Sequence, residues 1–168
     1  MGAREKLSVI IPTKDRHDDL LRLLESLRCQ GSKPIQIIVV DGGCISARAI
    51  CDKFSDLSID YIQMSPPSLT VQRNMGIKAL NPESTIAVFL DDDIVLMDGS
   101  FRAMEKFWDG SSQVVGGASF NLINESYKKP TLLEQVFLVN TSSNKILRSG
   151  FQGRISVVQH NIKAEWLV

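Results

Sequence analysis

Apolar residues in the first 120 positions fall into short unbroken runs, which alternate with segments of helical periodicity. Unbroken runs are typical of inner strands, because both faces of such a strand are covered by other elements. Buried strands are therefore predicted at Leu7–Ile11, where Pro12 stops the run, at Ile35–Val40, which ends at Asp41, and at Ile86–Leu90. Weaker strands are predicted near Ile59–Gln63 and over Val114–Phe120.

Amphipathic helices are predicted between these strands. After the first strand, Asp15 to Asp19 supply N-cap candidates, and the apolar face of the helix comprises Leu20, Leu21, Leu23, Leu24 and Leu27. Gly31 and Pro34 mark its end. Further helices are predicted at about Ser46–Phe54, at Leu69–Leu80 and from Gly99 through Trp108.

The alternation of strands and helices predicts an α/β fold, a Rossmann-like sandwich whose mostly parallel central sheet is flanked by helices. The expected strand order is three-two-one-four. In such sheets ligands bind beyond the carboxyl ends of the strands, where the order reverses. This rule places Pro12-Thr13, Asp41 and Asp91–Asp93 along one edge of the sheet, beside a nucleotide-sized crevice.

Three adjacent carboxylates, Asp91, Asp92 and Asp93, directly follow the Ile86–Leu90 run. They repel one another, and no Lys or Arg lies within several residues of them in the sequence. Oxygen ligands on a short turn suit a hard divalent cation, Mg²⁺ or Mn²⁺, which often shares its ligand shell with substrate phosphates. A solvated acidic turn is the alternative, and the position at the end of a buried strand favours the cation.

Composition narrows the class of protein. A chain of 168 residues with 43% hydrophobic content fits one domain with a proper core. Lys+Arg and Asp+Glu balance at 19 each, so nothing suggests binding to nucleic acid through bulk charge. There is no apolar run long enough for a membrane span, and Met1–Lys6 does not look like a secretory signal. Cys29, Cys44 and Cys51 lack metal-binding spacing and fit free thiols in a reducing cytoplasm.

Four segments together resemble an inverting family 2 glycosyltransferase of the GT-A fold. They are Ser8-Val9-Ile10-Ile11-Pro12-Thr13-Lys14-Asp15-Arg16, Ile38-Val39-Val40-Asp41-Gly42-Gly43, Gln72-Arg73-Asn74-Met75-Gly76 and Phe89-Leu90-Asp91-Asp92-Asp93. Their order and spacing match over about residues 7–120. The resemblance implies an enzyme that transfers a sugar from a nucleoside diphosphate sugar to a glycan or lipid-linked acceptor. It also implies a nucleotide-sugar-binding core at residues 1–120 and the start of an acceptor-side region at 121–168.

On the nucleoside side, the resemblance implies that Pro12 and Thr13 shape the loop against the nucleoside, with Arg16 near it. Asp41 would accept a hydrogen bond from the base, commonly uracil. The alternative for Asp41 is that it caps the next helix. The turn after it reads Gly42-Gly43-Cys44 instead of the family's more frequent sequence, which is expected to loosen the turn.

On the diphosphate side, the resemblance implies that Arg73 and Asn74 lie close to the diphosphate and ribose. The three acids correspond to the family's DxD motif. Asp91 and Asp92 would contact ribose and sugar, and Asp93 would coordinate the divalent ion, with Asp91 as a second candidate ligand. For Arg73 an ordinary exposed cation on a helix is the alternative.

Inversion needs a general base that deprotonates the acceptor hydroxyl. In relatives this carboxylate follows a segment that Glu165-Trp166-Leu167 resembles, so we expect it beyond Val168, with Glu165 as a weak candidate. The apolar ending at Val168 suggests a truncated chain, and we expect it to bind donor and metal but to transfer poorly or not at all. We expect the protein in the cytoplasm, with peripheral attachment to the inner face of the membrane through Leu132–Val139 as an open alternative.

Three other functions stay open at this stage. A nucleotidyltransferase shares a related sheet and metal requirement, but it usually carries a glycine-rich loop that Pro12-Thr13-Lys14-Asp15 lacks. A phosphoacceptor signalling domain carries its paired acids after the first strand, and here they follow a later one. A non-catalytic nucleotide-sugar-binding module is the third. The sequence identifies neither the donor sugar, the acceptor nor the oligomeric state.

Overall fold

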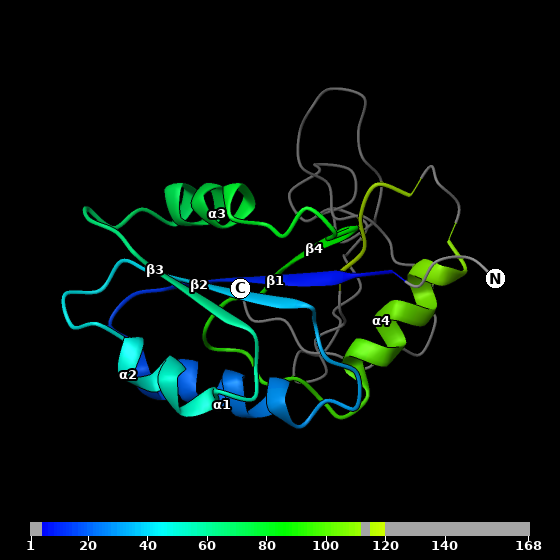
Figure 1. Cartoon of the computed structure of the whole chain (residues 1–168), viewed down its shortest axis with the longest axis horizontal. Coiled ribbons are helices and arrows are strands. Elements are labelled where there is room, and N and C mark those ends of the chain that lie inside the picture. The colour runs from blue at the N-terminus through cyan, green and yellow to red at the C-terminus, as the bar shows by residue number, and fades with distance from the viewer. Residues whose placement is uncertain (1–4, 112–114, 120–168) are drawn as a thin grey trace, which may run out of the picture.

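The computed structural model describes residues 5–111 and 115–119, and its centre is a parallel four-stranded sheet (Figure 1). The strands are β1 (Leu7–Thr13), β2 (Gln36–Asp41), β3 (Ile59–Gln63) and β4 (Ile86–Phe89), in the order β3-β2-β1-β4. The helices are α1 (His17–Arg28), α2 (Arg48–Cys51), α3 (Leu69–Lys78) and α4 (Ser100–Asp109), and a 3₁₀ turn, η1 (Asp52–Phe54), follows α2. The predicted fold class and strand order are confirmed.

The helices cover both faces of the sheet, with α3 on one face and α1 and α2 on the other (Figure 1). Because successive residues of a strand point to opposite faces, β1 supplies two separate cores. Val9 and Ile11 pack with the leucines of α1 in the larger core, and Ile10 packs with Ile38 on the α3 side. The unbroken apolar runs therefore reflect strands that are buried on both faces.

Gly76 sets how closely α3 approaches the sheet. A Cβ atom at this position would lie 2.3 Å from Cγ2 of Ile10 in β1, well inside van der Waals contact. The glycine in the Gln72–Gly76 segment thus has a packing reason, because only a residue without a side chain lets the helix axis come this near to the strand.

The first strand differs from its predicted end, because β1 continues through Pro12 to Thr13. The Leu90 amide donates to the carbonyl of Ile10, so the polar groups of Ile10 face β4. Pro12, two residues later, presents its nitrogen to the same side. There the pairing with β4 has already ended, at Phe89, so the missing N–H of proline costs no ladder hydrogen bond.

Two other sequence predictions are corrected. The helix expected at Ser46–Phe54 is divided into the short α2 and the 3₁₀ turn η1. The strand expected over Val114–Phe120 is not formed at residues 115–119, which adopt no regular secondary structure. Gly116 and Gly117 lie within this stretch, and glycine weakens a strand because it has no side chain to pack.

None of the helices within residues 5–111 and 115–119 has the length and hydropathy needed to cross a bilayer. The three cysteines are free thiols, as predicted. The predictions for Leu132–Val139, for Glu165 and for the rest of the 121–168 segment lie outside the described residues.

Candidate functional site

A pocket of about 300 Å³ lies at the carboxyl edge of the sheet, where β1 and β4 end. Its lining comes from the loop after β1, from the start of α3 and from the acid triplet. The lining residues are Pro12, Thr13, Lys14, Arg16, Leu69, Gln72, Asp91, Asp92 and Asp93. The fold thus brings Pro12-Thr13 and Asp91–Asp93 together at this edge of the sheet, as predicted.

Asp92 is the buried member of the triplet, with 5% of its surface exposed. The Thr13 hydroxyl donates to Asp92 Oδ2 over 2.7 Å, and Arg16 Nη1 lies 3.2 Å from Asp92 Oδ1. Burial raises the pKa of Asp92 above its usual value, and the contacts with Thr13 and Arg16 oppose that rise. These contacts fix the middle carboxylate between the ends of β1 and β4.

The outer two acids each pair with an arginine that lies far away in the sequence. Arg16 Nη1 is 2.8 Å from Asp93 Oδ2, and Arg73 Nη2 is 2.8 Å from Asp91 Oδ1. The carboxylates of Asp93 and Asp92 raise the pKa of Arg16 above its usual value. The inference that the triplet lacks neighbouring cations is therefore wrong in three dimensions, because the fold supplies Arg16 from the loop before α1 and Arg73 from α3.

Asp41 is fully buried, and the pocket lining does not include it. Its Oδ1 accepts from the Gly43 amide over 2.7 Å, and its Oδ2 accepts from the Ala47 amide over 2.8 Å and from the Tyr61 hydroxyl over 2.6 Å. These bonds hold the turn that leads into α2, which is the capping alternative raised for this residue. Base recognition by Asp41 stays a prediction, and it would require this network to open.

The Gly42-Gly43 turn is tight, contrary to the expectation that it would be loose. A Cβ atom on Gly42 would lie 2.9 Å from Cβ of Pro67, and one on Gly43 would lie 2.8 Å from Oδ1 of Asp15. The Asp15 carboxylate accepts from the Cys44 amide over 2.8 Å. Asp15 consequently connects the loop after β1 with the loop after β2. The N-cap position of α1 is occupied by Arg16, which makes no side-chain capping hydrogen bond.

Sequence reasoning missed three residues that line the pocket: Lys14, Leu69 and Gln72. Gln72 is buried, and its Nε2 donates to the carbonyls of Thr13 and Val40, each over 2.8 Å. Its place in the Gln72–Gly76 motif was the available signal, but nothing in the spacing shows which carbonyls it reaches. Asn74 is exposed and does not line the pocket.

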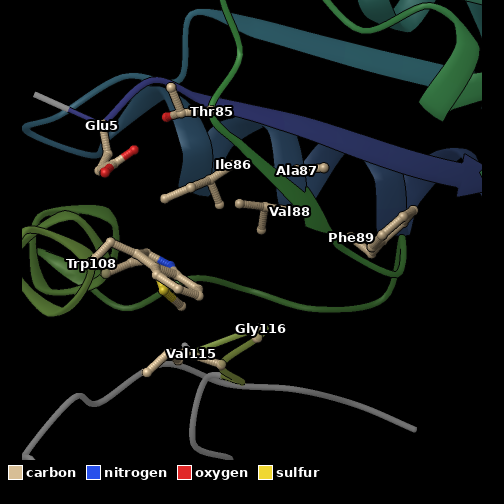
Figure 2. A pocket seen from close by; sticks show the side chains of 12 residues that line it. Glu5, Thr85, Ile86, Ala87, Val88, Phe89, Trp108, Val115 and Gly116 are labelled. Atoms are coloured by element: carbon tan, nitrogen blue, oxygen red, sulfur yellow. The ribbon is translucent and has the colours of Figure 1, made fainter. Parts of the chain in front are cut away.

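A second hollow, of about 490 Å³, runs along β4 and is a poor candidate for the same chemistry. Figure 2 shows Ile86 and Val88 of β4 on one side of it, with Trp108 of α4 and Val115 on the other. Among the described residues that line it, Glu5 is the single charged side chain. Because the described residues that line this hollow include no cation, it does not suit a diphosphate, and the carboxyl-edge pocket is the better candidate for a nucleotide site.

Comparison with known proteins identifies the family. The model of glycosyl transferase family 2 matches residues 8–161. The chain belongs to this family. It is 29% identical over 127 residues to an uncharacterized glycosyltransferase of Rickettsia conorii, covering 73% of this chain and 20% of that protein. It is 33% identical over 92 residues to glycosyltransferase GlyA of Streptococcus pneumoniae, covering 53% of this chain and 13% of that protein. The family 2 chain thus spans about a fifth or less of the length of these curated relatives.

Solved structures with the same fold include S. aureus TarS. TarS residues 1–349 in complex with UDP-GlcNAc align with a TM-score of 0.55 and 24% identity, covering 62% of this chain and 31% of that one. The same TarS fragment in complex with UDP aligns with a TM-score of 0.54 and 25% identity, covering 62% and 32%. These likenesses confirm the GT-A type of fold for the family 2 chain.

The carboxylates of the triplet suit a cation that is coordinated jointly by protein and ligand, and not a cation that protein side chains coordinate alone. Within the described part of the chain, no three His, Cys, Asp or Glu side chains are grouped closely enough to hold a metal ion. Mg²⁺ is commonly held by one or two carboxylates together with substrate phosphates. The side chains of Asp93 and Asp91 are 35% and 32% exposed and face the pocket, so their oxygens can serve such a shared ion.

Proposed function

We propose that this family 2 chain binds a nucleoside diphosphate sugar, with UDP as the nucleotide, for inverting transfer to a glycan or lipid-linked acceptor. The observation that carries the proposal is the carboxyl-edge pocket, in which the loop after β1 and the acid triplet meet. The TarS structures in complex with UDP-GlcNAc and UDP support the choice of nucleotide.

The charges of the pocket suit a diphosphate that is held by arginines and a divalent cation. Lys14 and Arg16 line the pocket, and Arg73 contacts Asp91 at its margin. Asp93, together with Asp91, would hold Mg²⁺ or Mn²⁺. Bound there, the cation would offset the repulsion between carboxylates and phosphates and stabilise the diphosphate as it leaves.

Two buried neutral residues, Thr13 and Gln72, hold the acids in position. Thr13 orients Asp92 through its hydroxyl, and Gln72 joins the ends of β1 and β2 behind it. A fixed carboxylate needs no reorganisation when charge develops on the leaving group. Glu165, the candidate base for the acceptor, lies outside the described residues.

Calorimetric titration with UDP, with and without Mn²⁺, tests the proposal. We expect binding that depends on Mn²⁺ and that falls by about tenfold or more in Asp93→Ala, since a ligand to the cation is lost. Asp98→Ala is the matched control, because Asp98 is an exposed acid five residues further on and outside the pocket lining. Equal UDP binding with and without Mn²⁺, or an Asp93→Ala variant that binds like the control, would contradict it.

A further inference from the structure

One nitrogen of Arg16 holds two members of the acid triplet at once. Arg16 Nη1 lies 3.2 Å from Asp92 Oδ1 and 2.8 Å from Asp93 Oδ2. The Arg16 side chain is 52% exposed, whereas that of Asp92 is 7% exposed. The guanidinium therefore covers the carboxylates from the solvent side, within the lining of the pocket.

This position conflicts with a divalent cation at Asp93. A guanidinium and a divalent cation carry charge of the same sign and would compete for the same carboxylate oxygens. Arg73 creates no such conflict at Asp93, because its partner is Asp91 Oδ1. Of the two arginines that hold the triplet, Arg16 is therefore the one that competes with the cation for Asp93, while Arg73 pairs with the second candidate ligand, Asp91.

We propose that Arg16 is a displaceable counter-ion, which pairs with Asp92 and Asp93 before ligands bind and releases Asp93 when cation and nucleotide bind. This inference rests on the proposed function, since it concerns the same cation and the same diphosphate. The released guanidinium then pairs with the diphosphate, whose oxygens match its planar set of donors.

The exchange at Asp93 is easy because the Arg16–Asp93 ion pair is exposed to solvent, with side chains that are 52% and 35% exposed. Exposed pairs contribute little to stability, so replacing them needs little driving force. The diphosphate draws Arg16 away and so strengthens cation binding, and by linkage the cation strengthens nucleotide binding to the same degree. Arg16 thereby couples the binding of cation and nucleotide. A site whose carboxylates had no such counter-ion would bind the cation without the nucleotide.

The experiment measures Mn²⁺ binding to the full chain by electron paramagnetic resonance of the free ion, first without nucleotide and then with UDP. In Arg16→Gln we expect Mn²⁺ to bind about two- to fivefold more tightly without nucleotide, the range that an exposed ion pair accounts for. With Mn²⁺ saturating, UDP should bind about tenfold more weakly, because a charge-assisted contact to the diphosphate is lost. Arg16→Lys keeps the positive charge and should return Mn²⁺ binding toward the wild-type value.

Arg22→Gln is the matched control, since Arg22 is an exposed cation of α1 that pairs with Asp19 outside the pocket. It should leave both affinities unchanged. If Arg16→Gln leaves Mn²⁺ binding without nucleotide unchanged or weakens it, the inference is overturned while the proposed function stands. If wild-type UDP binding is indifferent to Mn²⁺, the proposed function itself fails.

Discussion

Gln72 in α3 donates a hydrogen bond of 2.8 Å to the backbone carbonyl of Thr13, 59 residues earlier in the chain. The same amide donates to the carbonyl of Val40, so one side chain joins the carboxyl ends of β1 and β2. Since Thr13 also holds Asp92, Gln72 supports the pocket from behind.

Replacement of Gln72 should therefore cost both stability and affinity. Gln72→Met keeps the length of the side chain but removes both donors, and we expect a loss of about 1–3 kcal/mol in the free energy of unfolding. Urea denaturation measures this loss, and Gln63→Met, at an exposed position of β3, is the control. A Gln72→Met variant as stable as the control would show that the amide does not join the strands.

The close approach of α3 to β1 gives a second prediction. Gly76→Ala places a methyl group 2.3 Å from Cγ2 of Ile10, so the helix or the strand must shift. Overpacking of this kind costs about 1–3 kcal/mol. Gly31→Ala is the matched control, because a Cβ atom there meets nothing within 4 Å. Thermal unfolding should separate the two variants clearly, and equal melting temperatures would contradict the packing described for Gly76.

Asp41→Ala should destabilise the turn that leads into α2. The buried amides of Gly43 and Ala47 and the hydroxyl of Tyr61 would lose their charged acceptor, at a cost of about 3 kcal/mol. Unchanged stability in urea would contradict the network. Titrations with UDP and with pyrophosphate, at a temperature where the variant is folded, then test base recognition. A greater loss for UDP supports contact with the base, and equal losses remove Asp41 from that role.

The Cys51 thiol should make the free energy of unfolding depend on pH in alkaline solution. Burial raises the pKa of the Cys51 thiol from 9.0 to about 11. Between these values the folded state binds more protons than the unfolded state, so the free energy of unfolding falls as pH rises from about 9 to about 11.

The loss assigned to Cys51 should approach about 2 kcal/mol and should be absent from Cys51→Ala. Subtracting the two stability curves, measured by urea denaturation across this range, isolates the thiol from other groups that titrate there. Cys29→Ala, at an exposed cysteine, should keep the wild-type slope. Parallel curves for wild type and Cys51→Ala would contradict a buried, protonated thiol.

The strands and their order could be predicted because each inner strand is a separate apolar run, and the rules for parallel crossovers leave few arrangements. The same rules placed Thr13 and Asp91–Asp93 at one edge. The charge balance of the pocket could not be predicted, because Arg16 lies 76 residues from Asp92 and no local pattern selects it from the other cations. The bonds of Asp41 were equally hidden, since they depend on the path of the turn and on Tyr61 in another strand.

The central claim is that a divalent cation joins a nucleotide diphosphate to Asp93 at the carboxyl edge of the sheet. The most direct measurement is a crystal structure of the chain with UDP and Mn²⁺, in which anomalous scattering locates the ion. We predict an ion about 2.1 Å from a carboxylate oxygen of Asp93 and bound to the diphosphate, with Arg16 turned away from that oxygen. Nucleotide bound in the pocket while Asp93 stays paired with Arg16, without an ion between them, would contradict the claim.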